Sequence, residues 1–126
     1  MKSLTVVTLI IICITLIISF HMYKINSLVD EIDTLSDTVM KEYSAENWSG
    51  VSENLDKIED IWKKSRLWVC STVSTKQIDE IEISLKQSME YANLSSKEDF
   101  LGEFGMFRLC IEHILMQEGI SLYELL

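Results

Sequence analysis

The residue types that usually carry chemistry in proteins are few in this sequence, and they are widely spaced. Its two histidines are His21, beside a long apolar stretch, and His113, beside Glu112. A bound metal ion needs three or four converging ligands, and neither histidine has a second histidine near it in sequence. We therefore expect His21 to be an interfacial residue and His113 to be structural or exposed, with no metal site.

Acidic residues occur as neighbours in three places, at Asp30/Glu31, Glu59/Asp60 and Asp79/Glu80. Neighbours in a helix point in different directions, whereas a catalytic acid–base pair needs one carboxyl with a raised pKa in an apolar pocket. These pairs are therefore more typical of solvated helix faces. The chain also has no Gly-x-Ser-x-Gly turn, no P-loop and no dinucleotide-type glycine pattern. The sequence predicts a protein that is not an enzyme and needs no cofactor.

The three cysteines, Cys13, Cys70 and Cys110, are odd in number and far apart, which is not the pattern of a disulfide framework. We expect Cys70 at the end of one helix and Cys110 about nine residues before the end of a parallel helix, a stagger of roughly 13 Å. A disulfide requires Cα atoms within about 7 Å of each other. The sequence therefore predicts free and mostly buried thiols.

Residues 4–20 contain no charged side chain and are almost entirely apolar. Extended as a helix to Tyr23, this stretch has roughly 20 residues, enough to cross a hydrocarbon core of about 30 Å. Residues 19–23 are too bulky for the small-residue cleavage site of an export signal. We expect an uncleaved transmembrane anchor over residues 1–24, in contact with membrane lipid through residues 4–23. The alternatives are a cleaved export signal and a buried helix of a soluble domain.

The orientation of this anchor follows from the basic residues at its two ends. Lys2 and the α-amino group precede it, and Lys24 follows it. The positive-inside rule counts bases and gives little weight to acids. The small resulting bias places the N-terminus in the cytoplasm and residues 25–126 outside it, at the cell membrane.

The charge of the remaining chain limits its partners. Residues 24–126 contain 10 Lys and Arg and 20 Asp and Glu, a net charge of about −10. Nucleic acids demand a basic face, so we expect no nucleic-acid partner. Anionic lipid also repels an acidic domain that would lie flat on it. An acidic, solvated surface that keeps the domain soluble is the simplest interpretation.

Beyond the anchor, apolar residues recur at helical spacing, and no strand-like alternation occurs. The apolar positions fall in four segments, over residues 25–43, 48–69, 78–92 and 100–115. Short links between helices of about 20 residues require antiparallel neighbours. The sequence therefore predicts an all-α fold, in which a transmembrane helix is followed by an antiparallel four-helix bundle of two helical hairpins over residues 25–126. We expect the first bundle helix to continue from the anchor.

Several polar residues have the types and positions of helix caps. Ser44 is expected to cap the second helix, and Ser74 to cap the third in a capping box with Gln77. Ser96 precedes two acids in the expected first turn of the fourth helix, where the helix dipole favours negative charge. Gly119 suits the left-handed residue that ends a helix.

Three glycines, Gly50, Gly102 and Gly105, fall inside these expected helices. Each costs about 1 kcal/mol relative to alanine at such a position. Close approach of a neighbouring helix, under Trp48 or Phe104, would explain that cost. We therefore expect these glycines to serve packing inside the bundle.

Four features of the chain together resemble a clostridial-type bacterial family catalogued as domain of unknown function 4363. They are the N-terminal membrane helix, the helix with Trp48, Leu55 and Trp62, the segment 77–85 (QIDEIEISL), and the ending formed by residues 111–114 and 118–122. The resemblance covers nearly the whole chain. It implies a small anchored helical protein with no assigned activity, often encoded near a multi-pass membrane protein.

The chain departs from that family at three positions. Thr75, Gln77 and Leu115 stand where the family tends to have His, Glu and Pro. If the family uses that histidine chemically, this chain cannot do so. The resemblance does not imply an enzyme.

These features favour a protein-interaction or structural module at the cell envelope, with another membrane protein as its partner. The first bundle helix offers a seam with strict 3-4 spacing, formed by Ile25, Leu28, Ile32, Leu35 and Val39. The seam could instead join two copies into a homodimer. The alternative function is the binding of a peptide or small apolar ligand in a groove between the hairpins, lined by Trp62, Trp68 and Phe107.

Overall fold

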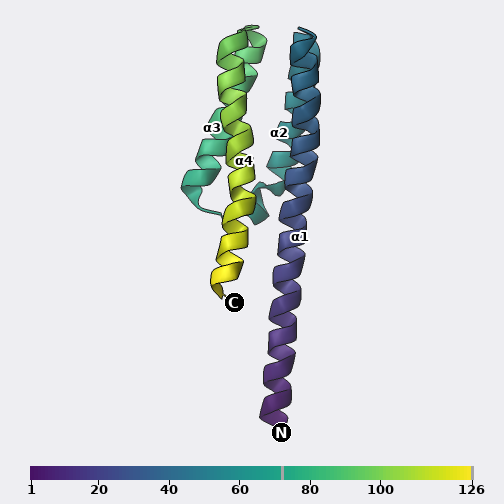
Figure 1. Ribbon diagram of the computed structural model, residues 1–126, viewed down its shortest axis with the longest axis vertical. Coiled ribbons are helices and arrows are strands. Elements are labelled where there is room, and N and C mark those ends of the chain that lie inside the picture. The colour runs from purple at the N-terminus through teal and green to yellow at the C-terminus, as the bar shows by residue number, and fades with distance from the viewer. Residues whose placement is uncertain (72, 126) are drawn as a thin grey trace.

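The computed structural model describes residues 1–71 and 73–125, and the side chains of residues 1–71 and 73–114; these residues form four helices and no strand. The helices are α1 (Lys2–Ser44), α2 (Trp48–Cys70), α3 (Thr75–Asn93) and α4 (Lys97–Leu125). Figure 1 shows α1 antiparallel to α2 and α3 antiparallel to α4, with both hairpin turns at the same end. The predicted all-α bundle of two helical hairpins is confirmed.

The first helix is continuous from the apolar segment into the bundle. α1 has 43 residues, a length of about 65 Å, and no Gly or Pro occurs between Lys2 and Ser44. Its N-terminal part extends alone beyond the other helices (Figure 1). Of the described helices, α1 is the one that is long and apolar enough to cross a membrane, and none of its most apolar window is buried. The fold is therefore compatible with a single-pass anchor.

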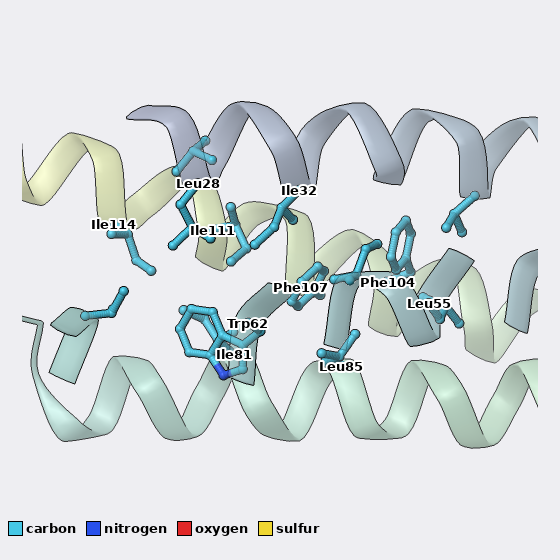
Figure 2. Packing of buried hydrophobic residues seen from close by; sticks show 14 of the residues in the cluster. Leu28, Ile32, Leu55, Trp62, Ile81, Leu85, Phe104, Phe107, Ile111 and Ile114 are labelled. Atoms are coloured by element: carbon cyan, nitrogen blue, oxygen red, sulfur yellow. The ribbon is translucent and has the colours of Figure 1, made fainter. Parts of the chain in front are cut away.

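The core of the bundle is filled by apolar side chains from all four helices. Figure 2 shows them interdigitating, with Trp62 of α2 and Ile81 of α3 facing Ile111 and Phe107 of α4. Aromatic rings run along α4, where Phe104 lies 5.3 Å from Phe100 and 5.8 Å from Phe107 between ring centroids. Burial of these side chains is the main force that holds the hairpins together.

Polar groups inside this core have partners. The hydroxyls of Ser36 and Ser88 each donate to the backbone carbonyl four residues earlier, at 2.7 Å. Among the described side chains, no buried nitrogen or oxygen atom lacks a hydrogen bond. Within the described side chains, no buried polar group therefore needs a bound ligand as its hydrogen-bond partner.

The two hairpin turns are short and similar. Glu46, between α1 and α2, has a φ of 58°, and Ser95, between α3 and α4, has a φ of 51°. Each is a non-glycine residue in the left-handed region, which lets the chain reverse within three residues. At this end Tyr43, Trp48 and Phe100 pack ring against ring, with centroids 5.6–5.8 Å apart.

Two of the predicted helix boundaries are wrong. Ser44 lies in the last turn of α1, and Asn47 caps α2 instead, because its side-chain oxygen accepts a hydrogen bond from the Gly50 N–H at 3.3 Å. Gly119 does not end α4, which continues to Leu125.

The other two predicted starts agree with the structure. The Ser74 hydroxyl accepts a hydrogen bond from the Gln77 N–H at 3.3 Å, as a capping box requires. Ser96 directly precedes α4 and donates to the Asp99 carboxylate at 2.8 Å. Both residues set where the second hairpin's helices begin.

Candidate functional site

The three residues predicted to line a ligand groove lie in two different environments. Trp62 is 2% exposed and Phe107 is 0% exposed, and both belong to the filled core. Trp68 is half-buried at the end of α2, beside α1. Trp62 and Phe107 therefore pack in the core and do not line a groove, while Trp68 belongs to a separate surface.

The predicted interaction seam on α1 is used inside the single chain. Its residues Ile25, Leu28, Ile32 and Val39 are buried in the core, and Leu35 is half-buried against it. A coiled-coil dimer through this seam would require the bundle to open. Surfaces available to a partner must be sought elsewhere.

One such surface lies on α4, opposite its row of buried phenylalanines. It consists of Leu101, Gly102, Gly105, Met106 and Leu109, which we name the α4 outer face. At 3.6 residues per turn these positions share one side of the helix. Leu101, Met106 and Leu109 are 46%, 52% and 61% exposed. Three large apolar side chains are thus presented to solvent on one helix.

The glycines of this face do not pack against another helix, so the packing role predicted for them is wrong. A Cβ added at Gly102 or Gly105 would meet nothing within 4 Å. Gly50 differs, because a Cβ there would lie 2.7 Å from the Asn47 amide nitrogen and 2.8 Å from a Glu42 carboxylate oxygen. Crowding by these two side-chain ends accounts for Gly50, whereas nothing in the described part of the chain accounts for Gly102 and Gly105.

A shallow groove of 390 Å³ borders the α4 outer face. From α3 and its cap it is lined by Ser74, Lys76, Gln77 and Glu80, and from α4 by Met106, Leu109, Cys110 and His113. Burial, together with the charge of Glu80, raises the pKa of the Cys110 thiol, so the thiol form predominates. No group of three metal-ligating side chains occurs among the described residues.

The cysteines are free, as predicted, but their burial differs from the prediction. Cys110 is half-buried and Cys70 is exposed. Cys70 occupies the last position of α2 and points away from the core, unlike its buried neighbour Val69. The expectation of mostly buried thiols is therefore wrong for Cys70.

A second surface lies where α1 emerges from its apolar segment. We name Phe20, His21, Lys24 and Trp68 the α1–α2 end cluster. The His21 and Trp68 rings meet edge to face, with centroids 6.1 Å apart. The Lys24 Nζ lies 5.1 Å from the Phe20 ring centroid and 5.6 Å from that of Trp68. Such cation–π contacts stabilise an ammonium between two rings.

Sequence reasoning missed this cluster, although hairpin geometry could have indicated it. The turn between α1 and α2 is centred on Glu46. In an antiparallel hairpin, residues equally distant from the turn lie side by side, and Lys24 and Trp68 are equally distant from Glu46 in sequence. The hairpin geometry therefore predicts that Trp68 lies beside Lys24, at the end of the apolar segment.

Ion pairs connect the two hairpins. Arg108 of α4 donates to Asp33 at 2.9 Å and to Asp37 at 3.0 Å, both on α1. Partial burial would by itself lower the pKa of the Arg108 guanidinium, but its bonds to the two carboxylates raise that pKa above its usual range. Lys97 pairs with Glu46, and Arg66 pairs with Glu82. These contacts fix the register between the hairpins.

The fold and these surfaces define an all-α protein with one helix of membrane-spanning length and a bundle built directly on it. A family model described as "Domain of unknown function (DUF4363)" matches residues 19–125. The chain belongs to this family, as its resemblance had suggested. Neither the search of curated proteins nor the search of solved structures found a match.

Proposed function

We propose that this protein is a single-pass membrane protein whose bundle lies outside the cytoplasm and binds another membrane protein at the cell envelope. The observation that carries the proposal is the α4 outer face. Its two glycines weaken the helix by about 1 kcal/mol each, and no described neighbour uses the space that they leave. A partner that occupies this space would account for them.

The chemistry of the α4 outer face suits a helix as the partner. Glycine has no Cβ and lets a neighbouring backbone approach closely. Leu101, Met106 and Leu109 provide apolar side chains around that point of approach. Exposed apolar patches on otherwise soluble surfaces commonly mark interaction sites.

The position of this face restricts the partner. Arg108, within the same stretch of α4, bonds to Asp33 of α1, which lies 13 residues beyond Phe20, a distance of about 20 Å along the helix. A partner in the same membrane must therefore extend at least about 20 Å beyond the end of the apolar segment. Together with the anchor, this favours an envelope protein that has its own helical extension.

The alternative, a module that binds a peptide or small apolar ligand between the hairpins, has less support. Trp62 and Phe107 are buried in the core, and Trp62 and Trp68 line two separate shallow pockets. Protein interaction through the α4 outer face is the function that the geometry favours.

Site-specific photo-crosslinking in whole cells tests the proposal. A photoreactive residue replaces Leu109 on the α4 outer face, and in a matched control it replaces Ile83, which is 56% exposed on α3. We expect a discrete adduct from position 109 that is absent from position 83. The adduct should disappear when Gly102 and Gly105 are both changed to Leu, which fills the space at positions where an added Cβ meets nothing within 4 Å inside the chain. Equal adducts from both positions would contradict the proposal.

The orientation is tested in the same cells with a membrane-impermeant maleimide. Leu94→Cys, in a chain whose native cysteines are serine, places an exposed thiol at the hairpin-turn end of the bundle, away from the apolar segment. This thiol should react in intact cells if the bundle lies outside. Reaction only after lysis would place the bundle in the cytoplasm and overturn this part of the proposal.

A further inference from the structure

The end of α2 lies at the same level as the end of the apolar segment of α1. Trp68 contacts both His21 and Lys24, which are one and four residues beyond Phe20. At 1.5 Å per residue they lie about 1.5–6 Å past the uncharged stretch. The headgroup layer on each side of a bilayer is about 5–8 Å thick, so Trp68 falls within that layer if α1 spans the membrane.

The side chains at this level have the character of an interface. Phe20 and Tyr23 are 61% and 70% exposed on α1, and Leu67 is 84% exposed on α2. Tryptophan and tyrosine concentrate at the boundary between headgroups and acyl chains. Lipid at this level would cover the exposed Leu67 side chain.

The last part of α2 differs in charge from the bundle as a whole. Residues 61–70, the last part of α2, contain Lys63, Lys64 and Arg66 and no acid, while residues 24–126 carry a net charge of about −10. Arg66 pairs with Glu82 and Lys63 with Glu59. These pairs offset two of the three bases, which leaves Lys64 to attract anionic phospholipid headgroups, whereas the rest of the bundle repels them.

We infer that Leu67 and Trp68 insert into the headgroup region of the bilayer that α1 crosses, so that α2 contacts the phospholipid surface beside α1. This inference rests on the proposed membrane anchoring. It adds a lipid-binding surface on α2, continuous with the lipid contact of α1. The α1–α2 end cluster then lies where the bundle meets the bilayer.

Tryptophan quenching by brominated lipids tests the seating. The full chain is reconstituted into vesicles of phosphatidylcholine and phosphatidylglycerol with bromine near the top of the acyl chains. Trp48→Phe retains Trp68, and Trp68→Phe retains Trp48 at the far hairpin turn, while the buried Trp62 is constant in both. We expect at least twofold more quenching in Trp48→Phe than in Trp68→Phe.

A second measurement does not depend on tryptophan. A polarity-sensitive fluorophore is attached to Leu67→Cys, and in a matched control to Leu94→Cys, in a chain whose native cysteines are serine. Leu67 and Leu94 are 84% and 74% exposed, at opposite ends of the bundle. We expect a blue shift in vesicles for the first label and none for the second.

The outcomes separate this inference from the proposed function. Co-flotation of the chain with vesicles, with equal quenching and no shift at position 67, would overturn the seating and leave the anchor intact. If the chain fails to float with vesicles, the anchoring itself is wrong and the seating falls with it. Quenching by lipid that requires Trp68, with a shift confined to position 67, supports the inference.

Discussion

Arg108 of α4 and Asp33 of α1 are joined by a hydrogen bond of 2.9 Å between residues 75 positions apart in sequence. The same guanidinium reaches Asp37 one turn further along α1. This link ties the second hairpin to the helix that carries the apolar segment. It makes the attachment of the hairpins measurable by single substitutions.

Arg108→Gln should lower the free energy of unfolding by about 1 kcal/mol, because two charge-assisted bonds on a partly buried side chain are lost. Lys63→Gln is the control, since Lys63 bonds to Glu59 within the same helix, α2, and its loss should cost at most about 0.5 kcal/mol. Urea unfolding of the full chain in detergent, followed by tryptophan fluorescence, measures both. Equal losses of unfolding free energy in the two variants would show that the ion pairs of Arg108 stabilise the fold no more than a pair within one helix.

Gly105→Ala should stabilise the isolated protein by up to about 1 kcal/mol, because alanine favours the helix and its Cβ meets no neighbour. Gly50→Ala should gain less, since Asn47 and Glu42, which are hydrogen-bonded to each other at 2.7 Å, would have to move. The same unfolding assay compares the two variants. A loss of stability in Gly105→Ala would mean that the α4 outer face is already occupied within the protein.

The stabilising effect of Glu46 should depend on pH. A hydrogen bond from Lys97, and then its charge, lower the pKa of the Glu46 carboxyl. A lowered folded-state pKa contributes stability that is present above the unfolded-state pKa and is lost as the pH falls through the folded-state value. The difference in unfolding free energy between the native chain and Glu46→Gln should therefore shrink from neutral pH to roughly pH 3.

The control for this titration is Glu53→Gln, which removes one negative charge 4.0 Å from Lys57 within α2. Its difference from the native chain should change less with pH than that of Glu46→Gln. A constant difference for Glu46→Gln across the range would contradict the role of its ion pair with Lys97.

Cys110 should react with N-ethylmaleimide roughly tenfold more slowly than Cys70 at neutral pH, because the thiolate is the nucleophile and burial raises the pKa of Cys110. Glu80→Gln should speed the reaction at Cys110 by removing a nearby negative charge, without affecting Cys70. Mass spectrometry of timed digests reports each site, and unfolded protein provides the common reference rate. Similar rates at both cysteines in the folded protein would refute the expectation.

Apolar spacing was sufficient to predict the helices and their pairing, because each buried stripe must find a partner and short links leave antiparallel packing as the solution. The seam of Ile25, Leu28, Ile32 and Val39 shows the limit of this reasoning. Its spacing suits a coiled-coil dimer and a bundle core equally well, and the structure places it in the core.

The sites were harder to predict because they depend on what is absent around a residue. The sequence predicts that Gly102 and Gly105 pack against a neighbouring helix. Only the structure shows that a Cβ added at either position meets nothing within 4 Å. Trp68 shares the type and approximate spacing of core tryptophans, yet its position opposite Lys24 sets it at the end of the bundle. In both cases the role of the residue depends on how neighbouring helices are placed around it.

Because α1 is one unbroken helix, it fixes the rotational orientation of the whole bundle about the α1 axis. Each residue of an α-helix turns the chain by about 100°, and no Gly or Pro interrupts α1 where it leaves its apolar segment. One residue inserted between Lys24 and Ile25 would swing the α4 outer face by about 100° around the axis of α1, and four residues by about 40°. If α1 is anchored in a membrane as proposed, a neighbour there meets the α4 outer face in one rotational orientation, and rotation of α1 about its axis turns that face.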